Sequence, residues 1–175
     1  MIIVEKKIKA IFLDVDGVIN NDDTKVYTKD NWFVFVDDYL VERVKKIIDK
    51  TNAVVVLSSD WRKGLIREDR KPHLEELEEK LKEFGIDIYG YTPFLEDYMI
   101  DGLPYRAPRG AEIHKYLEQH PEIGEFVILD DRFDMDPYKA HVVLTKYYWG
   151  LTEKDVKKAI EVLNGKLIES RKGLW

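Results

Sequence analysis

Short apolar runs alternate with amphipathic stretches along the chain. The apolar runs are rich in Ile, Val and Phe, as expected of buried strands, whereas the stretches between them repeat apolar residues every three or four positions, as expected of helices. We expect strands over residues 8–13, 53–57, 86–91, 126–129 and 141–144, and helices over residues 37–50, 73–84, 110–117 and 152–165. This alternation predicts an α/β fold with a Rossmann-like parallel sheet flanked by helices.

Capping residues support the last of these helices. Thr152 is a good N-cap, Asp155 stands three residues later in the capping-box position, and Gly165 follows the helix. The most irregular stretch, residues 91–108, is rich in Tyr, Pro and Gly and is expected to form a loop. A chain of 175 residues with no repeat and no long linker predicts one domain over residues 1–175.

Acidic and hydroxyl residues stand where three of the expected strands end. Asp14 and Asp16 follow the first strand, Ser58 follows the second, and Asp130 and Asp131 follow the strand over residues 126–129. Each of these could be an ordinary turn or helix cap. In open α/β sheets, however, ligands bind at the carboxyl ends of the strands, so these residues are expected to meet in one site. Independent caps have no reason to share one edge.

Composition limits the chemistry that is available. The chain has no cysteine, which excludes a disulfide framework, a thiolate metal site and a thiol nucleophile. Its four histidines show no metal-binding spacing. A calcium loop of the EF-hand type is rejected, because Gly17 stands at the fourth position instead of the sixth and a strand precedes it. Carboxylates, hydroxyls and a bound cation remain.

The net charge and the hydropathy of the chain limit the classes of binding partner that we expect. A net charge of −6 argues against a stable complex held on nucleic acid by general electrostatics, although a local basic patch remains compatible with such binding. No stretch approaches the roughly 18 consecutive apolar residues of a membrane span, and no targeting leader is visible. We expect a cytoplasmic protein without a membrane partner.

The ordered motifs resemble those of the haloacid dehalogenase (HAD) superfamily, whose members transfer phosphoryl groups through an aspartate nucleophile. The first motif is a hydrophobic strand ending in DxDG, here IFLDVDGVIN at residues 11–20, and the second is a strand ending in Ser58. Arg109 stands where the third motif usually has lysine, and VILDD at residues 127–131 resembles the fourth. Finer features, DGVIN, LSSDWR, GYTPFL, RGAEI and ILDD, are similar to small HAD-type domains associated with RNA-repair proteins.

The chemistry of phosphate esters explains the acidic residues. Asp14 is the candidate nucleophile, and Asp16 is the candidate acid and base that protonates the leaving oxygen. Both nucleophile and phosphate are anionic, so an oxygen-bound divalent cation is needed, and Mg²⁺ fits best. Asp14 and Asp130 are expected to bind it, the resemblance adds the backbone carbonyl of Asp16, and Asp131 is expected to support it. Asp134 and Asp136 remain alternatives to Asp131.

The remaining phosphate oxygens require hydrogen-bond donors. Ser58 supplies a hydroxyl and Arg109 supplies a cation. A guanidinium is a planar fork, unlike the ammonium of the usual lysine, and Arg106 is a rival for the same role. Arg109 could also be an ordinary solvated residue at a helix start.

Residues next to Ser58 are candidates for substrate binding. Trp61 could stack on a base and Arg62 could bind a second phosphate, while the alternative is a core tryptophan and a surface cation. The basic run that follows is either a solvated helix face or a groove for a polyanion. Its members are Lys63, Arg67, Arg70 and Lys71.

Cap domains screen substrates in this superfamily, and here the segments before Ser58 and before Arg109 are too short to hold a large one. An open site suits a nucleic-acid end or a phosphoprotein, and a small phosphate ester under the 91–108 loop is also possible. The leading hypothesis is a Mg²⁺-dependent phosphatase that works through an aspartyl-phosphate, possibly on nucleotides or polynucleotide ends. The alternatives are a phosphotransferase or phosphomutase, and a catalytically silent phosphate-binding module.

Overall fold

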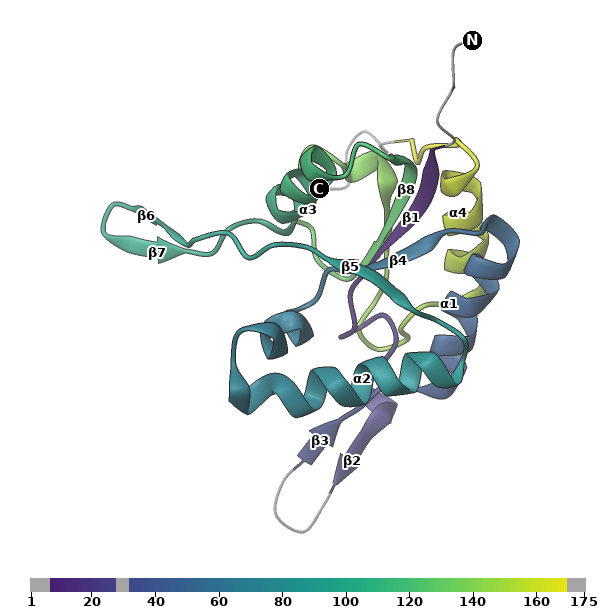
Figure 1. Ribbon diagram of the computed structural model, residues 1–175, viewed down its shortest axis with the longest axis horizontal. Helices are drawn as coiled ribbons and strands as arrows, with labels where there is room; N and C mark the ends of the chain where they lie inside the picture. Colours follow the sequence, from purple (N-terminus) through teal and green to yellow (C-terminus); the bar gives the residue numbers. More distant parts are fainter. Residues whose placement is uncertain (1–6, 28–31, 170–175) are drawn as a thin grey trace.

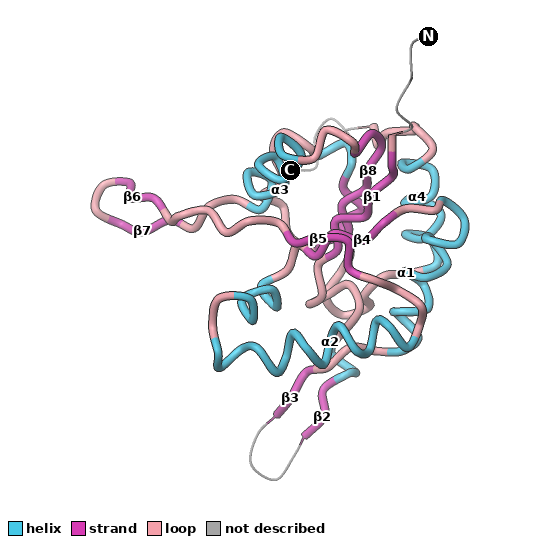
Figure 2. Tube along the Cα trace, viewed as in Figure 1, coloured by secondary structure: helices cyan, strands magenta, loops and turns pink. Residues whose placement is uncertain are grey.

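The computed structural model describes residues 7–27 and 32–169, and its centre is a five-stranded parallel sheet (Figures 1 and 2). The order of the strands is β5-β4-β1-β8-β9. Their bounds are β1 Ile8–Leu13, β4 Val54–Leu57, β5 Ile88–Tyr91, β8 Ile123–Asp130 and β9 Val142–Leu144. The central strand β1 pairs with β4 on one side and with β8 on the other, so its carboxyl end lies in the middle of one sheet edge.

Helices cover both faces of the sheet. Their bounds are α1 Asp38–Thr51, α2 Lys71–Glu83, α3 Arg109–Gln119 and α4 Glu153–Leu163. Side chains of β1 alternate between the two cores: Ile11 and Leu13 pack in the core with α1, α2 and α4, whereas Ala10 and Phe12 pack in the core with α3. Short 3₁₀ helices complete the fold at Asp22–Thr24, Asp60–Leu65, Glu68–Arg70 and Lys139–His141.

The α/β class with a helix-covered parallel sheet is confirmed. β1 has the bounds expected from the apolar pattern, and each of the other expected strands and helices is present with shifted ends. The capping box of α4 is present: the Thr152 hydroxyl accepts a hydrogen bond from the Asp155 amide, and the Asp155 side chain accepts one from the Thr152 amide. None of the described helices has both the length and the apolar character needed to cross a bilayer.

Two antiparallel hairpins were not predicted. β2 (Lys25–Tyr27) pairs with β3 (Trp32–Val34), and β6 (Tyr98–Ile100) pairs with β7 (Leu103–Tyr105). The expectation that residues 91–108 form only a loop was therefore wrong. Asp101 and Gly102 both have positive φ, which suits a tight hairpin turn, and the hairpin projects from the body in Figure 1. Within the described residues the insertions are hairpins of this size, and none forms a large cap.

Polar residues directly follow the strands at the carboxyl edge of the sheet. The parallel hydrogen-bond ladder continues one residue beyond the strands, because the amides of Asp14, Ser58, Thr92 and Thr145 donate to carbonyls of neighbouring strands at 2.8–3.1 Å. All four residues are buried, as is Asp130 at the end of β8. The fold therefore collects a row of acidic and hydroxyl side chains at one buried edge.

Candidate active site

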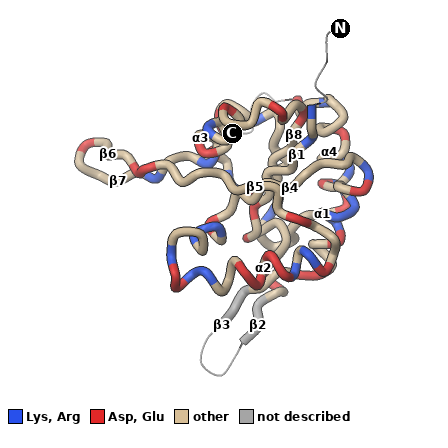
Figure 3. Tube along the Cα trace, in the orientation of Figure 1, with Lys and Arg blue, Asp and Glu red and all other residues tan. Residues whose placement is uncertain are grey.

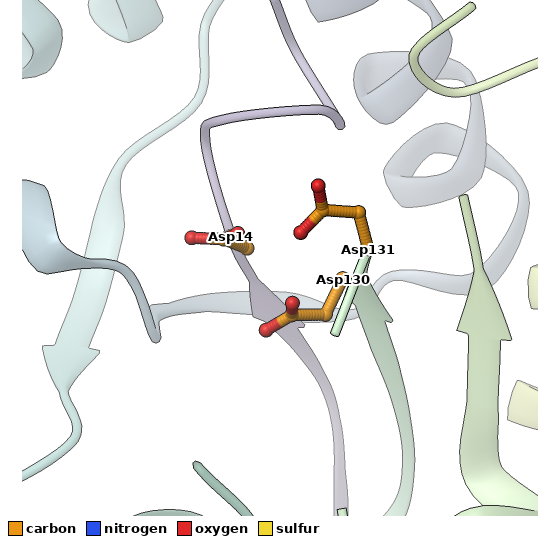
Figure 4. Close-up of side chains that lie close together, drawn as sticks. All are labelled: Asp14, Asp130 and Asp131. Atoms are coloured by element: carbon orange, nitrogen blue, oxygen red, sulfur yellow. The ribbon is translucent and has the colours of Figure 1, made fainter. Parts of the chain in front are cut away.

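Three carboxylates meet at the carboxyl edge of β1 and β8. Asp14, Asp130 and Asp131 each place an oxygen within 4.8 Å of the others, and their side chains face a common space in Figure 4. Asp14 and Asp130 are 5% and 1% exposed, so neither charge is well solvated. The expected meeting of the acids from the first and fourth motifs is thus present in the structure.

The protein compensates these charges poorly. Burial raises the pKa of Asp14 to about 7, against the opposing pull of the Arg109 guanidinium. Burial, and then the Asp14 charge, raise the pKa of Asp130 to about 8. Among the described residues, Oδ2 of Asp130 is a buried atom without a hydrogen-bond partner. Such a set of crowded, unsatisfied carboxylate oxygens fits a hard divalent cation of the Mg²⁺ type.

The turn after β1 brings the backbone close to Asp131. Gly17 has φ +75°, and a Cβ at this position would lie 2.6 Å from Oδ2 of Asp131. The Thr145 hydroxyl donates to the Gly17 carbonyl at 2.7 Å, which ties this turn to the end of β9. Both the left-handed backbone and the close approach require glycine in the DVDG motif.

Asp16 is held by two side-chain donors. Asn20 Nδ2 donates to its Oδ1 at 2.8 Å, and the indole Nε1 of Trp61 donates to its Oδ2 at 3.1 Å. The rest of the Trp61 ring packs against the core and against His73. The stacking of Trp61 on a substrate base stays a prediction; in the structure its ring is half-buried and its indole nitrogen contacts Asp16.

Two serines at the end of β4 have different environments. Ser58 is 1% exposed, and its Oγ accepts a hydrogen bond from the Thr92 hydroxyl at 3.4 Å. Ser59 caps the 3₁₀ helix that follows, and a hydrogen bond from its side chain lowers the pKa of Asp14 against the dominant effect of burial. The sequence pattern singled out Ser58 and not Ser59, so the contact of Ser59 with the candidate nucleophile was missed.

Arg109, and not Arg106, lies against the carboxylate cluster. Arg109 begins α3 and is 2% exposed, with its Nε 3.7 Å from Oδ2 of Asp130. Its Nη1 donates to Glu112 at 2.9 Å, while its buried Nε has no hydrogen-bond acceptor among the described residues. The side chain of Arg106 is 42% exposed and binds Asp60. The alternative of a solvated Arg109 is inconsistent with this burial.

Arg62 is a structural cation in this arrangement. It is 0% exposed, and its guanidinium donates to the carbonyls of Ser59 and Thr92 and to Oε2 of Glu112, the last at 2.6 Å. The guanidinium also lies 4.1 Å from the centroid of the Phe94 ring. The alternative that Arg62 is a surface cation is corrected, because its side chain is buried; its contact with a substrate stays a prediction.

Glu112 is the functional residue that sequence reasoning missed most clearly. Its Oε2 accepts hydrogen bonds from both Arg62 and Arg109, so one buried carboxylate balances two buried guanidiniums. The Arg109 charge acts against Arg62, and burial lowers the pKa of Arg62 to about 10 despite the Glu112 partner. The RGAEI motif contained Glu112 one turn after Arg109, which was the available signal.

The other acidic and basic candidates are occupied elsewhere. Asp134 accepts a hydrogen bond from the Arg109 amide at 3.0 Å, so it caps α3, and the Asp136 side chain is 76% exposed beside Lys139.

The residues of the basic run form ion pairs with nearby carboxylates, as the alternating red and blue before α2 in Figure 3 illustrate. The ion pairs are Lys63–Asp60, Arg67–Asp69, Arg70–Asp69 and Lys71–Glu75. A polyanion groove along this run is therefore not supported.

The family assignment rests on these motifs taken together. A family model described as the HAD domain in Swiss Army Knife RNA repair proteins matches residues 10–156, which include every site residue described above. The chain belongs to this family. A search of curated proteins finds no match. Among solved structures, a hypothetical protein from Xanthomonas campestris is similar at 13% identity, with 93% of this chain and 85% of that chain covered and a TM-score of 0.48.

The family fits the geometry of the site at a general level. The HAD domain makes a phosphatase-like role the expected one, and the buried acidic cluster is of the kind that holds Mg²⁺ in this superfamily.

Proposed function

We propose that this HAD domain is a Mg²⁺-dependent phosphatase that hydrolyses a phosphate monoester through an aspartyl-phosphate at Asp14. The observation that carries the proposal is the buried cluster of Asp14, Asp130 and Asp131, in which Oδ2 of Asp130 has no hydrogen-bond partner among the described residues. Burying such a cluster is costly for a fold and is relieved by a divalent cation. If the cluster had only a structural role, nothing would offset the free energy that its burial costs.

The first half of the proposed reaction forms the intermediate. A carboxylate oxygen of Asp14 attacks phosphorus and forms a new P–O bond, while the bond from phosphorus to the leaving oxygen breaks. Asp16, held by Asn20 and Trp61, gives a proton to the leaving oxygen. The alcohol leaves and Asp14 carries the phosphoryl group.

The second half releases phosphate. Asp16, now ionised, takes a proton from a water molecule that attacks phosphorus, and the bond between phosphorus and Asp14 breaks. Asp16 is then protonated and Asp14 is a free carboxylate, as at the start. Proton and charge therefore balance over the cycle.

The remaining groups handle the phosphate charge. Arg109 and the Ser58 hydroxyl are proposed to donate to the non-bridging oxygens, and this role is supported by the Nε of Arg109, which has no hydrogen-bond acceptor among the described residues. Side chains of Asp14 and Asp130, with the Asp16 carbonyl, would hold Mg²⁺, and Asp131 would support it. The cation, when bound, neutralises the charge that nucleophile and phosphate would otherwise oppose.

The RNA-repair description of the family points to phosphorylated nucleic-acid ends as the substrate class. The absence of a large cap among the described residues supports an end that is part of a long molecule. Water is the proposed acceptor of the phosphoryl group.

A turnover assay with an aryl phosphate tests the proposal. We expect phosphate release with Mg²⁺, none with EDTA, and a loss of at least about 10³-fold in Asp14→Asn. Asp136→Asn is the matched control, because it removes an exposed aspartate from the segment after β8, outside the carboxylate cluster. Hydrolysis that persists in Asp14→Asn or in EDTA would contradict the mechanism, and a wild type that hydrolyses no phosphate ester would favour a silent binding module.

A further inference from the structure

Two large aromatic rings are exposed beside the carboxyl edge of the sheet. Residues 146–150, KYYWG, form a turn directly after β9, which we call the aromatic turn. Tyr148 is 70% exposed and Trp149 is 67% exposed. Neighbouring rings of this size left so open to solvent commonly mark a binding surface.

The aromatic turn is fixed in place at both ends. At its start, the Thr145 amide donates to the Asp130 carbonyl at 3.0 Å and the Thr145 hydroxyl donates to the Gly17 carbonyl at 2.7 Å. At its end, the Leu151 amide donates to the Val18 carbonyl at 2.8 Å. Figure 1 shows the yellow-green turn beside the purple turn that follows β1.

The turn is also closed internally. The amides of Trp149 and Gly150 both donate to the Lys146 carbonyl at 2.9 Å. Gly150 has φ +63°, and a Cβ there would lie 2.9 Å from the Val18 carbonyl oxygen. The two rings are therefore presented on a rigid support that is bonded to the residues adjoining Asp16 and Asp130.

The charge of the molecule limits what such a surface can bind. The chain carries a net charge of −6, and the basic run near α2 is paired with neighbouring carboxylates, so general attraction to a phosphate backbone is weak. Stacking of bases on exposed rings does not depend on net charge and is tolerant of sequence. Lys146 is exposed at the start of the turn and forms no ion pair with a described carboxylate.

We propose that Tyr148 and Trp149 form a stacking platform for the nucleobases next to the terminal phosphate of a nucleic-acid substrate. This inference rests on the proposed function, since the platform orients an end whose phosphate reaches Asp14. Lys146 contacts the phosphate that follows in the strand. Through this platform, an open site on an acidic protein binds its substrate with an affinity that depends on the nucleobases.

The test compares binding of two pairs of single-stranded oligonucleotides to the Asp14→Asn protein, in which turnover is blocked. Both strands of the first pair carry a 5′-terminal phosphate, and both strands of the second pair carry a 3′-terminal phosphate. Within each pair, one strand is intact and the other lacks the bases of the two nucleotides next to the phosphate. We expect the intact strand of at least one pair to bind on the order of tenfold more tightly than its abasic partner. Trp149→Ala should remove this difference, and Trp149→Phe should retain most of it.

The matched control is Tyr89→Ala, which removes an exposed ring of β5 that bonds only to the surface residue Glu122. It should leave the base-dependent difference unchanged. Equal binding of intact and abasic strands, or no binding of either, would overturn the platform. So would self-association of the wild type that Trp149→Ala abolishes, because the rings would then belong to a contact between copies of the chain.

The outcomes separate this inference from the proposed function. Base-dependent binding without hydrolysis of any phosphate ester by the wild type would retain the platform and reject the phosphatase. Hydrolysis of phosphorylated ends with base-independent binding would retain the phosphatase and reject the platform. Melting temperatures of the variants confirm that each one is folded.

Discussion

The two charged halves of the site differ in how their charges are balanced. On one side, Glu112 joins Arg62 and Arg109 in a buried network in which each nitrogen of the Arg62 guanidinium donates a hydrogen bond. On the other side, Asp14, Asp130 and Asp131 crowd together, and burial raises the pKa of both Asp14 and Asp130. Each guanidinium of the basic half is hydrogen-bonded to a carboxylate, whereas Oδ2 of Asp130 in the acidic half has no hydrogen-bond donor among the described residues.

This difference separates the part of the site that is stable by itself from the part that needs a ligand. A buried network with its charges paired holds Arg109 in a fixed position and does not depend on a ligand. A buried cluster of like charges is stable only when a proton or a cation joins it. Arg109 connects the halves, because its Nη1 binds Glu112 while its Nε lies 3.7 Å from Asp130.

The largest expected effect comes from breaking the paired half. Glu112→Gln leaves the buried Arg62 without an ion-pair partner among the described residues and removes the carboxylate that is hydrogen-bonded to Arg109, so we expect a loss of about 3–5 kcal/mol in the free energy of unfolding. Urea unfolding measures it. Glu118→Gln is the control, since Glu118 lies on the same helix but is exposed. A loss below about 1 kcal/mol would mean that the network does not hold this part of the fold.

The next effect concerns the residue that connects the halves. Arg109→Lys keeps a positive charge but cannot bind Glu112 and face Asp130 with a planar fork, so we expect turnover of an aryl phosphate to fall about 10²-fold. Steady-state kinetics with Mg²⁺ measures this. Arg106→Lys, at an exposed position, should change turnover little. Equal losses of turnover in both variants would mean that Arg109 and Arg106 do not differ in their contribution to turnover.

The acidic half predicts a dependence of stability on pH. Because the folded pKa of Asp14 and of Asp130 is raised above the unfolded value, the folded protein binds more protons between about pH 4 and pH 8, and stability without metal should fall as pH rises through that range. We expect a fall of at least about 2 kcal/mol, because a difference of one in pKa between the folded and unfolded states corresponds to about 1.4 kcal/mol. Thermal unfolding in EDTA measures it.

Two controls sharpen that experiment. Saturating Mg²⁺ should reverse the fall, and more strongly at pH 8 than at pH 5, because the cation binds the ionised carboxylates. Asp130→Asn should flatten the pH dependence in EDTA, since one of the two raised groups is gone. A stability in EDTA that rises with pH would contradict the account of the cluster.

The smallest effect concerns the orientation of Asp16. Trp61→Phe retains a ring in the core but removes the N–H that reaches Oδ2 of Asp16, and a hydrogen bond to a charged group of this kind contributes about 1.5–3 kcal/mol. We expect kcat to fall about tenfold for an alkyl phosphate and less for an aryl phosphate, whose leaving oxygen needs less protonation. Equal losses on both substrates would assign Trp61 a packing role.

The sheet and the acidic cluster could be predicted from the sequence for one reason. Apolar runs identify parallel strands, and a parallel sheet places the residue after each strand at one edge, so Asp14, Ser58 and Asp130 had to lie near one another. The hairpins could not be found in this way, because strands of three residues are too short to show an alternating pattern.

The roles of Trp61 and Arg62 depended on partners that lie far away in sequence. Nothing near Arg62 in the chain indicates that Glu112 will neutralise it, and nothing near Trp61 indicates that its indole will reach Asp16. A basic or aromatic residue beside a phosphate site can face the ligand or support the residues that do. Tertiary packing decides between these two roles, and the spacing of residues in the local sequence does not reveal it.

The most direct measurement is mass spectrometry of the acid-quenched Asp16→Asn protein after brief exposure to an aryl phosphate and Mg²⁺. Because Asp16 is needed to activate water but little needed for an aryl leaving group, the account predicts a phosphoryl group on the peptide that contains Asp14, absent when EDTA replaces Mg²⁺. Asp14→Asn in the same background should carry none. Phosphate release without a phosphoryl group on Asp14, or a phosphoryl group on another residue, would contradict the account.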